Sequence, residues 1–195
     1  MPFAHGAILL AAGASRRLGQ PKQLVEVGGE TLLRRAACAL LATAPLDCVV
    51  VLGHAPDDMR AALAGLPLRS VVAADYAEGM AASLRTGIAA LDARCTGALI
   101  ALTDQPALDA AHLRALRDAW AEEPQNAAAS LYARTLGVPA LLPRSWFDDV
   151  AAIRGDTGAR ELLRTRADVV AVAAPELARD VDVPADLHPA REDHR

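Results

Sequence analysis

Aromatic residues are scarce in this chain of 195 residues: Phe, Trp and Tyr make up 3% of it, although 53% of the residues are hydrophobic. The core must therefore be built from Leu, Val, Ile and Ala, and the length suits one domain with a sizeable core. Few aromatics also disfavour a protein that stacks single-stranded bases on aromatic rings. The net charge of -4 provides no overall basic field, so we expect no nucleic acid partner.

Cysteine and histidine are too few and too scattered to predict a metal centre. The three cysteines, Cys38, Cys48 and Cys95, have no metal-binding spacing and cannot all pair, which favours free thiols in a cytoplasmic protein. We expect no functional role for the dispersed histidines, which are His5, His54, His112, His188 and His194. The first apolar run is too short to cross a membrane and follows no lysine or arginine, so we expect neither a membrane span nor a signal peptide.

Lysine is almost absent, because Lys22 is the only lysine among 20 basic residues. Arginine supplies every other cation of this kind in the chain. A retained lysine suggests a site that needs a compact ammonium group rather than a planar guanidinium, such as a site facing a triphosphate. A single lysine can also arise by chance.

Lys22 ends a polar loop that follows the first apolar run. Residues 7–12 have the length and composition of a buried strand, and Gly13 breaks that run. Backbone N–H groups in a glycine-containing loop can bind phosphate oxygens, while cations balance the phosphate charge. A solvated basic surface loop is the alternative. The polar, glycine and cationic residues after Gly13 are Ser15, Arg16, Arg17, Gly19 and Lys22.

Two better-known phosphate loops do not fit this segment. A P-loop needs four residues between its glycines and then Lys, whereas five residues separate Gly13 from Gly19 and Gln-Pro follows. A dinucleotide fingerprint needs Gly-x-Gly-x-x-Gly at the start of a helix, and Pro21 argues against a helix that runs through the loop.

Strands and helices alternate along the first half of the chain. Strands are predicted at 7–12, 47–52, 69–73 and 98–102, with helices at 32–41, 56–64 and after Gly79. This order predicts a parallel sheet with helices on both faces and ligands beyond the carboxyl ends of the strands. Strands at 127–132 and 138–142 are joined too closely for a parallel crossover, so that part is predicted to be antiparallel. Helices at 110–122 and 159–164 and a strand at 168–173 follow.

The predicted fold class is therefore α/β, a three-layer α/β/α Rossmann-like architecture with a mostly parallel mixed sheet. We expect a single domain over residues 1–187. Residues 188–195 are polar and are expected to form a loosely held tail.

Two further segments reach the same predicted edge of the sheet. Gly79 precedes a helix that begins with Met80 and Ser83, and a glycine with helical N–H groups behind it can approach a ligand closely. Asp104 follows the strand at 98–102, where a carboxylate facing a basic phosphate loop could hold Mg²⁺. The alternatives are an ordinary capped helix with a core methionine, and an aspartate that only accepts hydrogen bonds from loop amides.

These segments resemble a known family. LAAGASRRLGQPKQL is similar to the signature loop of MobA-like nucleotidyltransferases, which attach a nucleotide to the molybdenum cofactor, and it is most similar to the cytidylyltransferases among them. The Gly79 segment resembles the family's Gly-Met-x-x-Ser-Leu element, and Asp104-Gln105-Pro106 resembles its metal motif. The segment Arg154–Arg160 resembles the Gly-Asp-x-Gly-Ala-Arg loop, and residues 180–187 resemble the closing acidic segment. The motifs that carry the resemblance occur in the family's order over residues 6–187.

The resemblance implies a set of site residues. It makes Arg16, Lys22 and Asp104 catalytic, and it makes Mg²⁺ a cofactor held by Asp104 with one of Asp180 and Asp182. It places the nucleotide against Leu10, Ala11, Ala12, Gly13, Ser15, Arg16, Lys22, Gly79, Met80 and Ser83. Arg154, Asp156 and Arg160 are implied for the pterin phosphate, and a capped turn before a helix is the alternative for that loop.

The implied reaction transfers CMP from CTP to molybdopterin-type molybdenum cofactor. Ala12 occupies a position where guanylyl-transferring relatives carry Gly and cytidylyl-transferring relatives carry Ala. A guanylyltransferase, or an enzyme that acts on another phosphate acceptor, is the alternative within enzymes. A nucleotide-binding chaperone that delivers the finished cofactor without chemistry is the alternative outside them, and a target molybdoenzyme is a partner that both allow.

Overall fold

The computed structural model describes residues 3–13 and 21–178, and every structural statement below concerns this part of the chain. Its main strands are β1 (His5–Ala11), β4 (Asp47–Leu52), β5 (Arg69–Val72), β6 (Gly97–Leu102), β7 (Ala127–Tyr132), β8 (Thr135–Pro143) and β9 (Val169–Ala173). Its α-helices are α1 (Leu32–Leu41), α2 (Pro56–Ala62), α3 (Met80–Ala90), α4 (Ala110–Glu122), α5 (Phe147–Ala152) and α6 (Ala159–Thr165). Short pieces complete the fold: the hairpin β2 (Glu26–Val27) and β3 (Glu30–Thr31), and the 3-10 turns η1 (Lys22–Leu24), η2 (Tyr76–Glu78), η3 (Arg144–Trp146) and η4 (Pro175–Ala178).

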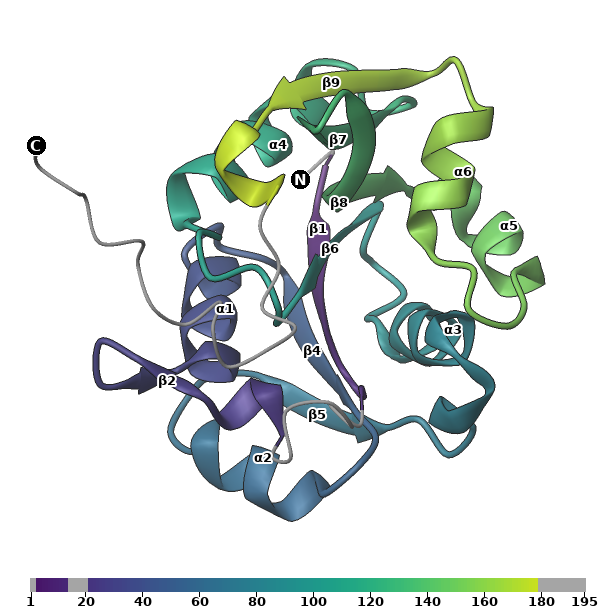
Figure 1. Cartoon of the computed structure of the whole chain (residues 1–195). Helices are drawn as coiled ribbons and strands as arrows, with labels where there is room; N and C mark the ends of the chain where they lie inside the picture. Colours follow the sequence, from purple (N-terminus) through teal and green to yellow (C-terminus); the bar gives the residue numbers. More distant parts are fainter. Residues whose placement is uncertain (1–2, 14–20, 179–195) are drawn as a thin grey trace, which may run out of the picture.

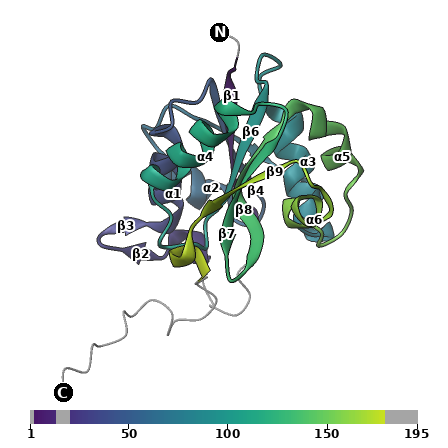
Figure 2. The same ribbon diagram turned by 90° about the horizontal axis from the view of Figure 1, so that it is seen from above.

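The main strands form one seven-stranded sheet in the order β5-β4-β1-β6-β8-β7-β9. Only β8 runs against the others in the described part of this sheet, because it pairs antiparallel with both β6 and β7. Helices α1, α2 and α4 lie on one side of the sheet and α3, α5 and α6 on the other, as the two views show (Figures 1 and 2). The predicted three-layer α/β/α fold with a mixed, mostly parallel sheet is confirmed.

Strand β1 lies in the middle of the sheet. Ile8 pairs with Val49 of β4 on one side and with Ile100 of β6 on the other. All seven residues of β1 are buried, as expected for a parallel strand that is covered on both faces. The apolar run before Gly13 therefore places the loop that follows it at the centre of one edge of the sheet.

Two hydrophobic cores fill the spaces between the layers. Leu9 faces the core shared with α1 and α4, while its neighbour Ile8 faces the core shared with α3 and α6. This alternation follows from the two-residue period of a strand. Trp120 and Trp146 are almost completely buried, one in each core, and most of the remaining core is aliphatic, as the composition predicted.

Side chains cap the first turns of two helices. The Thr31 side chain accepts a hydrogen bond from the Arg34 backbone N–H, and the Asp109 side chain accepts one from the His112 N–H. Helix α1 begins directly after Thr31 and α4 directly after Asp109, so both starts agree with the sequence prediction.

The largest difference at a strand boundary is in β8, which begins at Thr135, three residues before the predicted Val138. The reason is a tight two-residue turn at Ala133 and Arg134, both of which have positive φ (46° and 60°), so that Tyr132 pairs directly with Thr135. Such turns normally carry Asn or Gly, and an Ala-Arg pair gives no signal for one. The connection was therefore expected to extend through Gly137.

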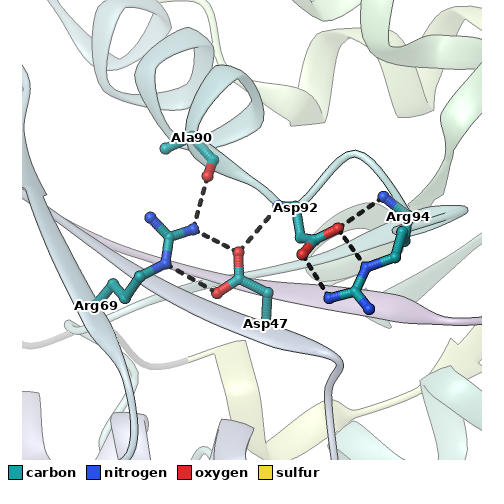
Figure 3. Close-up of polar contacts among 5 residues, drawn as sticks. All are labelled: Asp47, Arg69, Ala90, Asp92 and Arg94. Atoms are coloured by element: carbon teal, nitrogen blue, oxygen red, sulfur yellow. Dashed lines mark hydrogen bonds and ion pairs between the residues drawn. The ribbon is translucent and has the colours of Figure 1, made fainter.

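At the end of the sheet remote from Gly13, a network of hydrogen bonds joins β4, β5 and the end of α3 (Figure 3). Asp47 accepts two hydrogen bonds from the Arg69 guanidinium, at 3.2 and 2.6 Å, and so joins the starts of β4 and β5. Arg69 also donates to the carbonyl of Ala90 at the end of α3, and the Asp92 backbone N–H donates to Asp47. These contacts fix α3 against the sheet at the end remote from Gly13.

The three cysteines are free thiols, as predicted. Cys48 and Cys95 are buried, and burial raises the pKa of the Cys48 thiol to about 12 and that of the Cys95 thiol to about 11. Both groups are consequently protonated and unreactive at neutral pH. In the described part of the chain, no helix is long and apolar enough to cross a membrane.

Two histidines belong to the core rather than to the surface. His5 shares a 2.8 Å hydrogen bond with the Thr43 hydroxyl, and that hydroxyl donates to the Leu40 carbonyl. His112 shares a 2.7 Å bond with the Ser130 hydroxyl, which donates to the Pro139 carbonyl. Each hydroxyl proton is therefore used elsewhere, so each imidazole Nε2 carries the hydrogen and donates it. Burial lowers the pKa of His112, and burial together with the Arg117 charge lowers the pKa of His5 to about 4.

These lowered pKa values predict that stability falls in mild acid. An unfolded histidine titrates near pH 6.5, so the unfolded chain binds more protons than the folded chain between about pH 6.5 and 4. The free energy of unfolding should fall as the pH drops through this range, by up to about 1.4 kcal/mol per pH unit for each histidine. Urea unfolding at pH 7, 6, 5 and 4.5 measures the slope. His5→Gln should flatten it, whereas His54→Gln, at an exposed position, should leave it unchanged. An equal slope in wild type and His5→Gln would contradict the assignment.

Candidate active site

A cleft of about 860 Å³ opens at the carboxyl ends of β1 and β6, the edge that the sequence predicted for ligands. Its walls come from the end of β1, the turn η1, the end of β6, the start of α3 and the loop before α6. The lining residues are Leu10, Ala12, Gly13, Lys22, Gln23, His54, Tyr76, Ala77, Gly79, Met80, Ser83, Leu102, Thr103, Asp104 and Asp156.

Lys22 and Asp104 form an ion pair in this cleft. The Lys22 ammonium lies 2.7 Å from Asp104 Oδ2, and their side chains are 18% and 20% exposed. Two local features bring them together, since η1 follows the loop after β1 and Asp104 follows β6, the strand next to β1. Salt and water screen the attraction in such a half-buried pair less than in a surface pair. The pair therefore holds one cation and one anion at defined points of the cleft.

The second oxygen of the Asp104 carboxylate takes no part in this ion pair. Asp104 Oδ1 is buried and has no hydrogen-bond partner within residues 3–13 and 21–178. A buried carboxylate oxygen without a partner is costly, and hard oxygen donors are what Mg²⁺ and Mn²⁺ bind. No group of three or more potential metal ligands occurs in the described part of the chain. A metal there would therefore need oxygens from elsewhere, such as substrate phosphates or the acidic segment that includes Asp180 and Asp182, which lies outside the described residues.

Gln23 holds the end of β1 in place. Its side chain is 1% exposed, and its Nε2 group donates to the Ala11 carbonyl at 3.0 Å and to the Gly13 carbonyl at 2.7 Å. The residue therefore fixes the backbone on both sides of Ala12, where the chain leaves the sheet. Sequence reasoning missed Gln23, because a glutamine beside a lysine has the appearance of an ordinary surface residue.

Gly79 is required by a protein contact. A Cβ atom at this position would lie 2.5 Å from both Asp156 Oδ1 and the Gly155 carbonyl oxygen, and Gly79 has φ of +117°. The Gly155 carbonyl also accepts a hydrogen bond from the Ala81 N–H, and a Cβ at Gly158 would meet the Met80 sulfur at 2.6 Å. The loop before α6 thus packs on the first turn of α3. The close approach of this loop is thus a reason for Gly79 within the protein itself, and close approach of a ligand stays a prediction.

A second glycine shapes the wall around Ala12. A Cβ at Gly53, just after β4, would lie 2.6 Å from the Ala12 carbonyl oxygen and 2.7 Å from the Tyr76 ring. The absence of that atom leaves room for Tyr76 and Ala12, which line the cleft together with His54. Ala12 is 5% exposed, so its methyl group is part of a packed wall.

The structure brings most of the predicted nucleotide-site residues together. Leu10, Ala12, Gly13, Lys22, Gly79, Met80, Ser83 and Asp104 all line the cleft. Ala11 is buried behind it, with its side chain in the core on the α1 side, and only its carbonyl is engaged by Gln23. Ser15, Arg16, Asp180 and Asp182 lie outside the described residues.

The predicted pterin-phosphate residues are dispersed. Asp156 lines the cleft. Arg154 donates instead to the Ala151 and Ile153 carbonyls at the end of α5, and Arg160 is exposed on α6. Within the described residues neither arginine lines the cleft.

Five cleft residues besides Gln23 were not predicted as site residues: His54, Tyr76, Ala77, Leu102 and Thr103. Tyr76 and His54 stand beside glycines, but neither belongs to a motif from which site residues were predicted. His54 was set aside as incidental, yet the crossover after β4 places it at the cleft. The only signal that could have identified these residues is their position after predicted parallel strands, at 47–52 and 69–73.

Known proteins of similar sequence and structure agree on the type of domain. Residues 7–171 match the model of the MobA-like NTP transferase domain. Nicotine blue oxidoreductase of Paenarthrobacter nicotinovorans is 33% identical over 187 residues, which cover 90% of this chain and 90% of that protein. The crystal structure of Rv0371c from Mycobacterium tuberculosis H37Rv superimposes with a TM-score of 0.83 at 32% identity, covering 94% of this chain and 95% of that one.

A structure of Rv0371c in complex with manganese is also similar. Its TM-score is 0.75 at 28% identity, covering 96% of this chain and 94% of that chain. The family match covers the main sheet except the first two residues of β1 and the last two of β9. It includes the Lys22–Asp104 pair and the wall around Ala12. The chain belongs to the family of MobA-like NTP transferase domains, whose reaction is nucleotidyl transfer to an acceptor.

Proposed function

We propose that this protein transfers CMP from CTP to the terminal phosphate of molybdopterin-type molybdenum cofactor, giving the cytosine dinucleotide and pyrophosphate. The observation that carries the transferase part is the Lys22–Asp104 pair, which sets an ammonium group and a buried carboxylate oxygen side by side in the cleft. A triphosphate needs both a cation for its charge and a metal-binding oxygen nearby.

The residues fit a divalent cation, which would be held by Asp104 Oδ1 with Asp180 or Asp182. When bound, such an ion neutralises and orients phosphate oxygens. Magnesium is our choice, and the manganese complex of Rv0371c supports a site of this class.

The protein groups act mainly by position and charge. Gly13 and the residues after it would hold the triphosphate through backbone amides. Lys22 and Arg16 would offset the charge that develops on pyrophosphate as the bond between the α-phosphorus and the bridging oxygen breaks. The acceptor phosphate oxygen attacks the α-phosphorus in line from the opposite side.

The preference for CTP follows from Ala12 and its packed wall. Its methyl group lies close to Gly53, in a cleft wall that also includes Tyr76. The methyl group would narrow the space where a base stacks, which favours a pyrimidine over a purine. One methyl group contributes only about 1 kcal/mol in packing terms, so Ala12 is one determinant among several.

The acceptor would lie along the wall formed by the start of α3 and the loop before α6, where Asp156 faces the cleft. A carboxylate accepts hydrogen bonds from N–H and O–H groups and repels phosphate. Asp156 therefore suits the ring or hydroxyl donors of the acceptor. Arg160 is exposed on α6 and does not line the cleft, so its contact with the acceptor phosphate stays a prediction.

Thermal unfolding with Mg²⁺ and each of CTP, GTP, UTP and ATP tests this proposal. Ligand at 100 times its dissociation constant adds about 2.7 kcal/mol, which should raise the melting temperature by roughly 5–11 °C for a chain of this size. We expect that rise with CTP and a smaller one with GTP. A larger rise with GTP would overturn the proposed role of Ala12 in base selection, but it would still support nucleotidyl transfer.

Nicotine blue oxidoreductase gives a second candidate function, because a relative of this similarity bears the name of an oxidoreductase. NADH and NADPH therefore belong in the same series of melts. Stabilisation by a nicotinamide dinucleotide and by none of the triphosphates would favour an oxidoreductase. Release of pyrophosphate from CTP in the presence of molybdenum cofactor would favour the transferase over both that enzyme and a carrier protein.

A further inference from the structure

We propose that Gln23 is a positioning residue for nucleotidyl transfer, which fixes both the backbone at the end of β1 and the lysine beside it. This inference rests on the proposed function, because it concerns the groups that would hold the triphosphate. Gln23 would act through Lys22 and the backbone at the end of β1, and it would not take part in the chemical step itself.

The first step is the hydrogen bonding of the side chain. Gln23 Nε2 has two hydrogens, and it donates to the carbonyls of Ala11 and Gly13 at 3.0 and 2.7 Å. The pairing of β1 with β6 ends at Leu10, so these carbonyls lie where that side of the ladder has stopped. Beyond the end of that strand pairing, the buried Gln23 side chain supplies the hydrogen bonds that these two carbonyls accept.

The second step is the geometry of the peptide unit. A peptide bond is planar and trans, so a carbonyl and the N–H that follows it point in opposite directions. When Gln23 holds the Ala11 carbonyl, it therefore also directs the Ala12 N–H away from itself. Gly53 gives a second fixed point, since a Cβ there would touch the Ala12 carbonyl oxygen at 2.6 Å. Backbone donors at this turn are thus set before any ligand arrives.

The third step links this backbone to Lys22. Gln23 and Lys22 share the 3-10 turn η1, closed by hydrogen bonds from Leu24 N to the Pro21 carbonyl and from Val25 N to the Lys22 carbonyl. Gln23 attaches that turn to the end of β1, while Lys22 reaches Asp104 at the end of β6. A shift of the Gln23 side chain would therefore move the Lys22 ammonium relative to the phosphate site.

A purely structural role for Gln23 predicts different kinetics. If the side chain only satisfied two carbonyls, its loss would reduce stability and would act independently of Lys22. If it positions Lys22, the effects of the two residues must be non-additive, because the second change removes the group that the first one serves.

The experiment is a double-mutant cycle on pyrophosphate release, with CTP, Mg²⁺ and molybdenum cofactor. Gln23→Met keeps the length of the side chain and removes both donors. It should lower kcat/KM for CTP by about 10- to 100-fold in the wild-type background, because small displacements of charged groups are costly in this type of reaction. In the Lys22→Ala background, the same change should cost less than about threefold. Gln23→Glu, which has the same size and no donors, should show the same pattern if Gln23→Met folds poorly.

Thr43→Ala is the matched control. Thr43 is also 1% exposed and bonds a backbone carbonyl, but it does so beside His5, at the other end of β1. It should lower the melting temperature and leave kcat/KM within twofold of wild type. Equal losses from Gln23→Met in both backgrounds, or a loss below threefold in wild type, would overturn the positioning role alone. A wild-type protein that releases no pyrophosphate would overturn the proposed function, and this inference with it.

Discussion

Replacing Asp104 by alanine should lower the rate of pyrophosphate release by about 10²–10³-fold, the usual cost of removing one electrostatic group from a transfer site. The change deletes the buried Oδ1 atom, which has no partner in the described part of the chain, and with it our candidate metal ligand. It also deletes the 2.7 Å contact that orients the Lys22 ammonium. Initial rates at saturating CTP over a series of Mg²⁺ concentrations would measure the effect.

Two further variants make that result specific. Asp104→Asn keeps the shape of the side chain and loses the charge, so it should remain impaired at Mg²⁺ concentrations that saturate the wild type. Asp118→Ala removes an exposed carboxylate from α4, where it pairs with Arg117, and should leave the rate unchanged. A loss of less than tenfold in Asp104→Ala would show that the carboxylate does not act in the reaction.

Replacing Lys22 by alanine should also lower the rate by about 10²–10³-fold, since it removes the ammonium group beside the phosphate site. The fall should appear in kcat more than in KM, because charge builds up on the leaving pyrophosphate in the transition state. Steady-state kinetics with CTP would separate the two parameters.

Lys22→Arg tests why this chain keeps its single lysine. Arginine preserves the charge but replaces a compact ammonium with a wide planar group, and the cleft fixes Nζ at 2.7 Å from a carboxylate. We therefore expect Lys22→Arg to recover no more than about a tenth of wild-type activity. Arg114→Ala, an exposed cation on α4, is the comparison for general charge effects. Near-normal rates in Lys22→Ala would refute the assignment.

The layered fold could be predicted because each part of its signal is local. A buried strand such as β1 has an apolar run, and helices α1 and α4 begin at Thr31 and Asp109, whose side chains cap them. Alternating strands and helices then leave few possible topologies. The turn at Ala133 and Arg134 escaped prediction because its backbone is imposed by the pairing of β7 with β8 rather than by turn-forming residues.

The candidate site was predictable where residues follow strands directly. Gly13 and Asp104 come just after β1 and β6, and the carboxyl ends of parallel neighbours necessarily meet at one edge. Gln23 and Asp156 could not be placed in this way. Their positions depend on a side chain that reaches back ten residues and on a loop that packs against Gly79, and a single sequence gives no measure of such contacts.

The central place of β1 has a consequence for how the chain is made. Strand β1 precedes both of its neighbours in the chain. It pairs with β4 from Gly6 and Asp47 onward, and with the later strand β6 from His5 and Gly97 onward. While the chain grows past β5, three parallel strands can assemble with one side of β1 still open. An unprotected apolar edge of that kind invites pairing with other nascent chains. Rapid synthesis through residue 102 would therefore protect the yield of folded protein, and a pause before it would favour aggregates.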